Sequence, residues 1–367
     1  MDPQRKRVLV APLEWGLGHA TRCVPVINEL LRQKAEVILA ADGGPYDFLA
    51  QEFPQLKLIR LPGYGITYPQ GGGLALHLLM HSPLITHRIR EERRQIAKIV
   101  ETHKIDIIIS DNRFACLSKQ TRNVYITHQL MVKSILPKLT TNLHRRYYDE
   151  FDELWIPDYE GNKNLSGELS HNDERETWMH YVGPLSRFSH ASSWTQRPYA
   201  WWLVVLLSGP EPQRTNFEKL ILEELPKFTE ETLIVRGLPG KTKLPKTRLP
   251  HVHFVNHLPD AELQEALLST HHVLCRPGYS SLCDLSTLDL CPIVVPTPGQ
   301  PEQEYLAKLH AGMGHVVNVS QKKFNLSEAI RLHSRLRPFG VHPIPQLLAE
   351  RVKRLLARSK KEITVIA

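Results

Sequence analysis

Four short stretches of this chain combine glycine with histidine, serine, arginine or carboxylate side chains, and each follows a run of apolar residues. The first stretch is GLGHATR, residues 16–22. Gly16 and Gly18 permit a tight turn close to a ligand, and His19 opens an amphipathic helical pattern. The start of a helix favours an anion, and an imidazole at this point can take a proton from a hydroxyl group. The alternative is that His19 only caps the helix or fills the turn.

The second stretch, SGPEPQRT, occupies the same position after the first apolar run of the second half of the chain. Ser208, Gly209 and Arg214 are suited to an oxygen-rich anion. A proline-rich polar turn is the alternative interpretation.

The third stretch, CRPGYSSLCDL, is the most specific motif in the chain. A cation, Arg276, ends a strand, Gly278 makes the turn, and Ser280 and Ser281 open a helix. The amides and hydroxyls at such a helix start can bind a diphosphate.

The fourth stretch is the loop that follows the apolar run CPIVV, from residue 296 onward. Carboxylate and amide groups in the third and fourth stretches match a ligand rich in hydroxyls. Asp284 follows the two serines by one helical turn, on the face that can reach a ribose diol, and the loop after CPIVVPTPG presents Gln300, Gln303 and Glu304. We also place Val255, within the HVHFVNH run of residues 251–257, beside this ligand. Asp284 and Gln303 can equally be ordinary surface residues.

Two more polar residues end apolar runs in the first half of the chain. Asp111 closes IDIIISD, and His128 closes NVYITH. Because ligands of open α/β sheets bind outside the carboxyl ends of the strands, we expect these side chains near the ligand. Asp111 then orients His19, and His128 lies on the acceptor side; the alternative for Asp111 is a cap of the next turn.

The elements that must hold these residues are strands alternating with helices, in two successive series. The pattern predicts an α/β protein with two Rossmann-like, doubly wound domains that face one cleft. We predict an N-terminal domain over residues 1–185, a nucleotide-binding domain over 200–340 and a C-terminal amphipathic helix with its tail over 341–367. The polar stretch 186–198 is the expected linker.

Composition excludes several other classes of protein. The 367 residues carry a net charge of +8, which suits a phosphorylated small molecule or an anionic surface, and no nucleic-acid-binding motif is present. The five cysteines are odd in number and never form CxxC, which argues against disulfides and zinc and favours the cytoplasm. A dinucleotide-binding GxGxxG is absent, which disfavours a dehydrogenase.

The segment LALHLLMHSPLI, residues 74–85, and the adjacent HRIREERR, residues 87–94, allow two interpretations. They form either a core helix or a peripheral contact with an anionic membrane. The second interpretation places the protein at the inner face of the membrane.

Together these motifs resemble GT-B glycosyltransferases, most closely glycosyltransferase family 28, which includes the GlcNAc transferase that makes the peptidoglycan lipid intermediate. The resemblance spans nearly the whole chain and is strongest at RPGYSSLCDL and VPTPGQPEQEYLA. It implies that His19 is the catalytic base. The residues that it assigns to the donor are Arg276, Gly278, Ser281 and Asp284 for the nucleotide, and Gln303 and Glu304 for the sugar.

This sequence departs from the family pattern at three places. Asp284 stands where glutamate is usual, Glu304 stands where a second glutamine is usual, and the opening loop lacks extra glycines and carries Trp15 beside Glu14. The donor sugar and the acceptor therefore stay open.

The resemblance implies inverting transfer of a hexose or N-acetylhexosamine from a UDP-sugar to a hydroxyl acceptor, which is lipid-linked in one alternative. The helix start at Ser280 and Ser281, with Arg276 or Arg214, would stabilise the departing charge. We expect no cofactor and no metal, because the chain has no DxD triplet. A UDP-sugar 2-epimerase and a non-catalytic nucleotide-sugar binder are the rival hypotheses.

Overall fold

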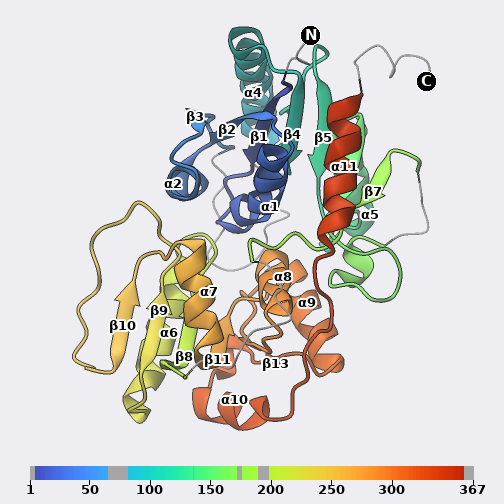
Figure 1. The fold of residues 1–367 in the computed structure, drawn as a ribbon. Helices are drawn as coiled ribbons and strands as arrows, with labels where there is room; N and C mark the ends of the chain where they lie inside the picture. Colours follow the sequence, from blue (N-terminus) through green and yellow to red (C-terminus); the bar gives the residue numbers. More distant parts are fainter. Residues whose placement is uncertain (1–4, 65–81, 135, 172–175, 189–197, 359–367) are drawn as a thin grey trace.

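The computed structural model describes residues 5–64, 82–134, 136–171, 176–188 and 198–358, with side chains from residue 86 onward in the second range. These residues form two lobes of parallel α/β structure, one stacked on the other (Figure 1). The predicted fold class is thereby confirmed.

The first lobe contains seven strands and the helices that cover them. In chain order its elements are β1 Arg7–Pro12, α1 Gly18–Arg32, β2 Glu36–Ala41, α2 Gly43–Glu52, β3 Lys57–Arg60, α4 Ser82–His103, β4 Ile107–Asp111, β5 Arg122–Ile126, α5 Pro137–Tyr148, β6 Glu153–Ile156 and β7 Met179–Tyr181.

The second lobe repeats the plan with six strands. Its elements are β8 Trp201–Leu206, α6 Gln213–Glu224, β9 Thr232–Val235, β10 Val252–Val255, α7 Asp260–Leu268, β11 Thr270–Cys275, α8 Tyr279–Thr287, β12 Ile293–Val294, α9 Pro301–Gly312, β13 Val317–Asn318 and α10 Leu326–His333. The helix α11 Pro345–Ala357 follows them in the chain. Short 3₁₀ turns lie at Gly167–Leu169, Leu225–Lys227 and Gln321–Lys323.

Both sheets are parallel and doubly wound. The strand order is β3-β2-β1-β4-β5-β6-β7 in the first lobe and β10-β9-β8-β11-β12-β13 in the second. In each sheet the order reverses beside the first strand, between β1 and β4 and between β8 and β11. Such a reversal opens a crevice at the carboxyl ends of the two strands, which is where ligands bind in this architecture.

The first strand of each lobe is apolar on both faces because helices cover both. In β1, Val8 and Val10 face the core under α1, whereas Leu9 and Ala11 face the core under α4. This alternation follows from the two-residue period of a strand. Buried residues of α1 recur at helical spacing, at Ala20, Cys23, Val24, Ile27 and Leu30.

The C-terminal helix α11 packs on the first lobe, although the chain enters it from the second lobe (Figure 1). Leu348, Val352 and Leu355 join the core under α1, and Gln33 donates a 2.8 Å hydrogen bond to the carbonyl oxygen of Ala349. The predicted separate C-terminal unit is therefore part of the first lobe's core.

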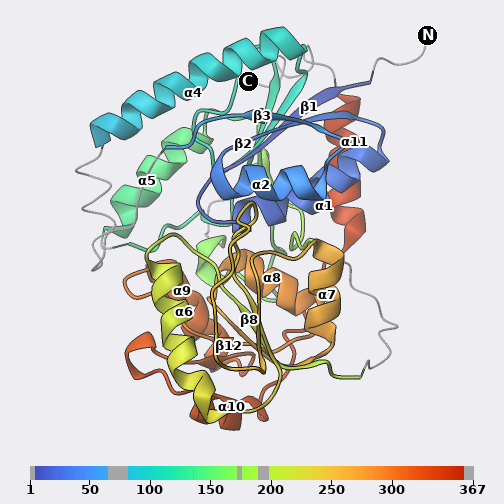
Figure 2. The same cartoon turned by 90° about the vertical axis from the view of Figure 1, so that its left-hand side faces the viewer.

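The two lobes touch where α1 and α8 begin, with α1 and α2 above α7, α8 and α9 in Figure 2. The Ser280 hydroxyl donates a 2.8 Å hydrogen bond to the carbonyl oxygen of Gly18. The expected switch-point loops of both sheets consequently lie at one interface.

Candidate active site

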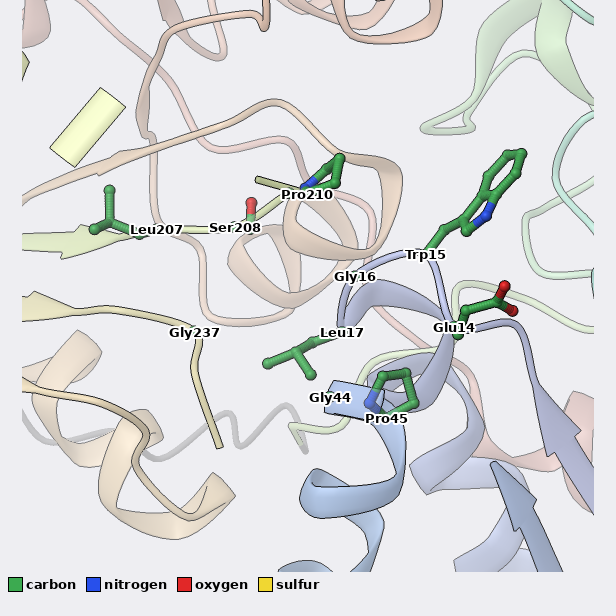
Figure 3. A pocket seen from close by; sticks show the side chains of 11 residues that line it. Glu14, Trp15, Gly16, Leu17, Gly44, Pro45, Leu207, Ser208, Pro210 and Gly237 are labelled. Atoms are coloured by element: carbon green, nitrogen blue, oxygen red, sulfur yellow. The ribbon is translucent and has the colours of Figure 1, made fainter. Parts of the chain in front are cut away.

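A cavity of about 260 Å³ lies between the switch-point loops of the two lobes (Figure 3). The loop from β1 to α1 and the start of α2 form one wall, and the loop after β8 together with Gly237 forms the other. The lining residues are Glu14, Trp15, Gly16, Leu17, Gly44, Pro45, Leu207, Ser208, Gly209, Pro210 and Gly237.

Two glycines of the predicted motifs face each other across this cavity. Gly16 has φ +70° and Gly209 has φ +94°, a backbone conformation that side chains disfavour. A Cβ on Gly16 would lie 4.0 Å from the amide nitrogen of Gly209, so the two loops lie close together. The pairing of GLGHATR with SGPEPQRT across one cleft agrees with the sequence analysis.

His19 and Asp111 are in direct contact. His19 Nδ1 lies 2.6 Å from Asp111 Oδ1, while the Arg22 guanidinium donates to both carboxylate oxygens of Asp111, at 2.5 and 2.7 Å. Burial alone would raise the pKa of Asp111, but the charge of Arg22 and the contact with His19 hold that pKa down to about 2.

The ionised Asp111 fixes the tautomer of His19. A carboxylate can only accept a hydrogen bond, so in the neutral imidazole the contact with Asp111 places the proton on Nδ1 and the lone pair on Nε2, although Arg22 Nη2 also lies 3.0 Å from Nδ1. The His19 side chain is 15% exposed, whereas Asp111 is fully buried. The pair is therefore an imidazole oriented by a buried carboxylate, an arrangement that is chemically able to act as a general base.

His128 lies between the lobes and not on an open acceptor face. Its Nδ1 accepts a hydrogen bond from Arg22 Nη1 at 2.7 Å, and its Nε2 donates to Glu302 Oε1 at 3.0 Å. The ring stacks on Tyr279 with centroids 4.3 Å apart. Burial lowers the pKa of His128 against the opposing effect of Glu302. Because both ring nitrogens have partners, His128 is not available to an acceptor in this state, contrary to expectation.

Two residues of this cluster, Arg22 and Glu302, were not predicted from the sequence. Arg22 follows His19 by three residues on α1, and its side chain is 1% exposed. Glu302 lies in the first turn of α9 and also accepts a hydrogen bond from the Gln129 amide. Burial alone would raise the pKa of Glu302, but His128 lowers it. The spacing of His19 and Arg22 was the available signal for the arginine.

The two arginines predicted to bind the donor are occupied inside the second lobe. Arg276 is fully buried and donates to the carbonyl oxygen of Val295 at 2.8 Å and to Gln321 Oε1 at 2.7 Å. Burial lowers its pKa to about 9. Arg214 is paired with Glu211 at 2.7 Å and Glu218 at 2.6 Å. Neither guanidinium lines the cavity. Arg276 connects the segments at Val295 and Gln321, and Arg214 connects the loop at Glu211 to helix α6.

Asp284 points toward the linker and not toward a ribose position. Ser186 donates to its Oδ1 at 2.8 Å, and Arg187 donates to its Oδ2 at 3.0 Å. The Asp284 side chain is 8% exposed, and burial raises its pKa. The carboxylate fixes the segment by which the chain passes from one lobe to the other, a role that the sequence analysis did not anticipate.

Gln303 and Glu304 shape their own loop. Gln303 Oε1 accepts a 2.8 Å hydrogen bond from the amide of Thr297, and Glu304 Oε1 accepts one of 3.2 Å from the amide of Gly299. Val255 ends β10 and packs against the core of the second lobe.

The helix start of the third stretch does face the first lobe. Gly278 is the N-cap residue of α8, Ser280 contacts Gly18, and Ser281 is partly exposed. Of the predicted donor residues, the structure thus brings Gly18, Ser208, Gly209, Gly278, Ser280 and Ser281 to the lobe interface, and it directs Arg214, Arg276, Asp284, Gln303, Glu304 and Val255 elsewhere.

In the described part of the chain, His, Cys, Asp and Glu side chains form no group of three or more that could hold a metal ion. Over the same residues, no helix is both long and apolar enough to cross a membrane.

Comparison with known proteins places this geometry in a class. No protein-family model matches the chain. An uncharacterized glycosyltransferase from Methanosarcina acetivorans is 22% identical over 354 residues, which cover 86% of each chain. The crystal structure of the glycosyltransferase SnogD from Streptomyces nogalater has a TM-score of 0.63 at 14% identity, covering 96% of this chain and 99% of that one.

A third similar protein is MnaA of S. aureus, solved with UDP. It has a TM-score of 0.60 at 10% identity and covers 99% of this chain and 98% of its own. The fold defined by both lobes is that of the GT-B glycosyltransferases. The relationship to family 28 rests on the sequence motifs alone and stays a prediction.

Proposed function

We propose that this protein is an inverting glycosyltransferase that moves a hexose or N-acetylhexosamine from a UDP-sugar to a hydroxyl acceptor in the interlobe cavity. One observation carries the proposal: His19, oriented by the ionised Asp111, lies two residues after Leu17, the last residue by which the β1–α1 loop lines this cavity. An imidazole whose Nδ1 proton is bound by a carboxylate keeps Nε2 as an acceptor for the proton of a hydroxyl group.

The chemistry follows from this pair. The acceptor oxygen forms a bond to the anomeric carbon while its proton moves to His19 Nε2, and the bond from that carbon to the diphosphate oxygen breaks with its electron pair. Asp111 stabilises the imidazolium that results. General-base assistance of this kind is worth about 10² to 10⁴ in rate.

The departing diphosphate needs a positive environment. The N-termini of α1 and α8 meet where Gly18 and Ser280 touch, so the positive ends of two helix dipoles converge there. We propose that these helix starts, and no metal ion, stabilise the leaving group. A nucleoside diphosphate is the donor class that suits two converging helix starts.

UDP is the proposed nucleotide, an assignment supported by the family resemblance and by the UDP complex of a protein with the same fold. A UDP-sugar 2-epimerase would use the same cleft without an acceptor. We favour transfer because the similar proteins of the previous section include named glycosyltransferases.

A thermal-shift screen over nucleoside diphosphates and their sugars tests the donor class. A ligand at about 100 times its Kd stabilises the folded state by about 2.7 kcal/mol. We expect UDP and a UDP-sugar to raise the Tm. The His19→Ala variant should keep this shift and lose transfer, whereas His253→Ala, at an exposed histidine, should keep both. Equal loss of binding and transfer in His19→Ala would refute the role of a base.

A lipid-linked acceptor at an anionic membrane is part of the proposal. The segment 74–85 lies largely outside the described residues, but the N-cap residue of α5, Leu136, and two leucines of that helix, Leu139 and Leu143, are exposed at helical spacing. Lys138 and Arg146 of the same helix are exposed as well. Apolar side chains flanked by cations suit the surface of an anionic bilayer. Flotation with vesicles of anionic lipid should carry the protein upward at low salt, and Leu139→Glu with Leu143→Glu should abolish this.

A further inference from the structure

Glu302 is a side chain of the second lobe that makes its contacts in the first. It follows Pro301 at the start of α9. Its Oε1 accepts from His128 Nε2 at 3.0 Å, and its Oε2 accepts from the side-chain amide, Nε2, of Gln129. Hydrogen bonds to an ionised carboxylate are about twice as strong as those between neutral groups. Glu302 therefore joins the two lobes at one point.

His128 connects this point to the interior of the first lobe. Arg22 donates to its Nδ1, Glu302 accepts from its Nε2, and Tyr279 of α8 covers one face of the ring. With both nitrogens bound, the imidazole has one tautomer and one orientation. Two of these three partners come from the second lobe, so the orientation of His128 depends on lobe closure.

Arg22 carries the connection to the base. Its Nη1 donates to His128, and its Nε and Nη2 donate to Asp111, which also binds His19. An unbroken series of hydrogen bonds therefore runs from Glu302 through His128, Arg22 and Asp111 to His19. The members are buried or partly buried, where hydrogen-bond networks fix a single geometry.

We infer that Glu302 is a positioning residue for His19: the carboxylate fixes the base in its working orientation only when the second lobe is closed on the first. The inference rests on the proposed function, since it assigns a role within that reaction. When the lobes separate, His128 loses Glu302 and Tyr279 together, and its ring can turn. Arg22 then keeps its contacts with Asp111 and with His19 Nδ1, but its partner at Nη1 is no longer held in place. His19 therefore loses its fixed orientation in the open state, when water can enter the cavity. Because the base is not in position at that stage, hydrolysis of the donor by water is limited.

Steady-state kinetics of two variants test this inference. Glu302→Ala removes the two hydrogen bonds that Glu302 accepts from the first lobe, and we expect kcat to fall at least tenfold while the KM for the donor changes less than threefold. Glu302→Gln keeps an oxygen that accepts from His128, and we expect it to retain more than one third of the wild-type kcat. Glu223→Gln, at an exposed position of α6, is the matched control.

Two kinetic outcomes would overturn the inference. Wild-type kcat in Glu302→Ala would show that the contact does not matter to the base. A raised KM at unchanged kcat would make Glu302 a donor contact and not a positioning residue.

A double-mutant cycle tests whether Glu302 and His128 interact, and it does not depend on enzymatic activity. If the protein transfers no sugar but the cycle shows this interaction, only the proposed function fails. Free energies of unfolding are measured for Glu302→Ala, His128→Ala and the double variant. We expect the double variant to lose less stability than the sum of the single losses, because each single change already breaks the shared hydrogen bond. Strict additivity would contradict the interlobe connection.

Discussion

Ser280 and Gly18 join the two lobes through a single 2.8 Å hydrogen bond from the serine hydroxyl to the glycine carbonyl oxygen. Each residue lies in the first turn of its helix, α8 or α1. A Cβ added to Gly18 would lie 3.3 Å from Ser280 Oγ, which is closer than ordinary van der Waals contact. The distance between the helix starts, and with it the space for a diphosphate, is therefore set by these two residues.

Gly18→Ala should displace the Ser280 hydroxyl and destabilise the protein by about 1 kcal/mol, the net contribution of one hydrogen bond. Thermal unfolding of Gly18→Ala, Ser280→Ala and the double variant measures this. In the Ser280→Ala background the alanine at position 18 meets no hydroxyl, so its cost should shrink. An equal cost in both backgrounds would show that the contact is not limiting.

Asp111 should make stability depend on pH in the acid range. Its pKa is about 2 in the folded state against 3.8 ordinarily. The unfolded chain takes up a proton near pH 4 while the folded protein does not, so the contribution of Asp111 is present above about pH 4 and is lost as the pH falls to 2. The contribution is about 2 kcal/mol. Urea unfolding between pH 2 and 5 should show a shallower pH dependence in Asp111→Asn, and an identical dependence would contradict the assignment.

Asp260 should give the stability of the fold the opposite pH dependence. Burial raises its pKa to about 7, although Arg187 opposes this with a 3.0 Å ion pair. Between about pH 4 and 7 the unfolded chain is ionised at this residue while the folded protein keeps the proton, so stability falls as the pH rises through this range. Asp260→Asn should raise the Tm at pH 8 and change it little at pH 4. Glu262→Gln, exposed on the same helix, should raise it at neither.

Arg276 offers a direct test of the family resemblance. Its guanidinium is bound to Val295 and Gln321 and lies 4.0 Å above the Phe217 ring. Arg276→Lys cannot reproduce these planar contacts. We expect a lower Tm with the Kd for UDP changed less than threefold by calorimetry. A tenfold weaker Kd at unchanged Tm would restore the nucleotide-binding role that the motif implies.

The alternation of strands and helices predicted both lobes, because parallel sheets covered on both faces leave a strong apolar pattern in the sequence. Residues at strand ends were also predictable. GLGHATR follows β1, Asp111 is the last residue of β4, and these two strands are neighbours at the switch point of the sheet. Their direct contact follows from that register. The short strands β7 and β13 were missed because three and two residues carry too little pattern.

Side-chain partners between the lobes could not be predicted in this way. Glu302 and His128 are 174 residues apart, and a glutamate in the first turn of a helix is an ordinary favourable choice whatever it contacts. In the sequence, Arg22 looks like a surface cation on an amphipathic helix. It is buried because its partner, the Asp111 carboxylate, is itself fully buried. Arg276 matched a family pattern, but its partners arise from β12 and the turn at Gln321–Lys323, which local sequence does not reveal.

The return of α11 to the first lobe has a consequence for how the protein is made. Leu348, Val352 and Leu355 complete a core whose other members lie mostly within the first half of the chain. During translation, that apolar groove stays uncovered until α11 has left the ribosome. The core of the first lobe is therefore completed only after the second lobe has been synthesised, and a fragment that stops at the linker would expose the apolar residues that α11 covers.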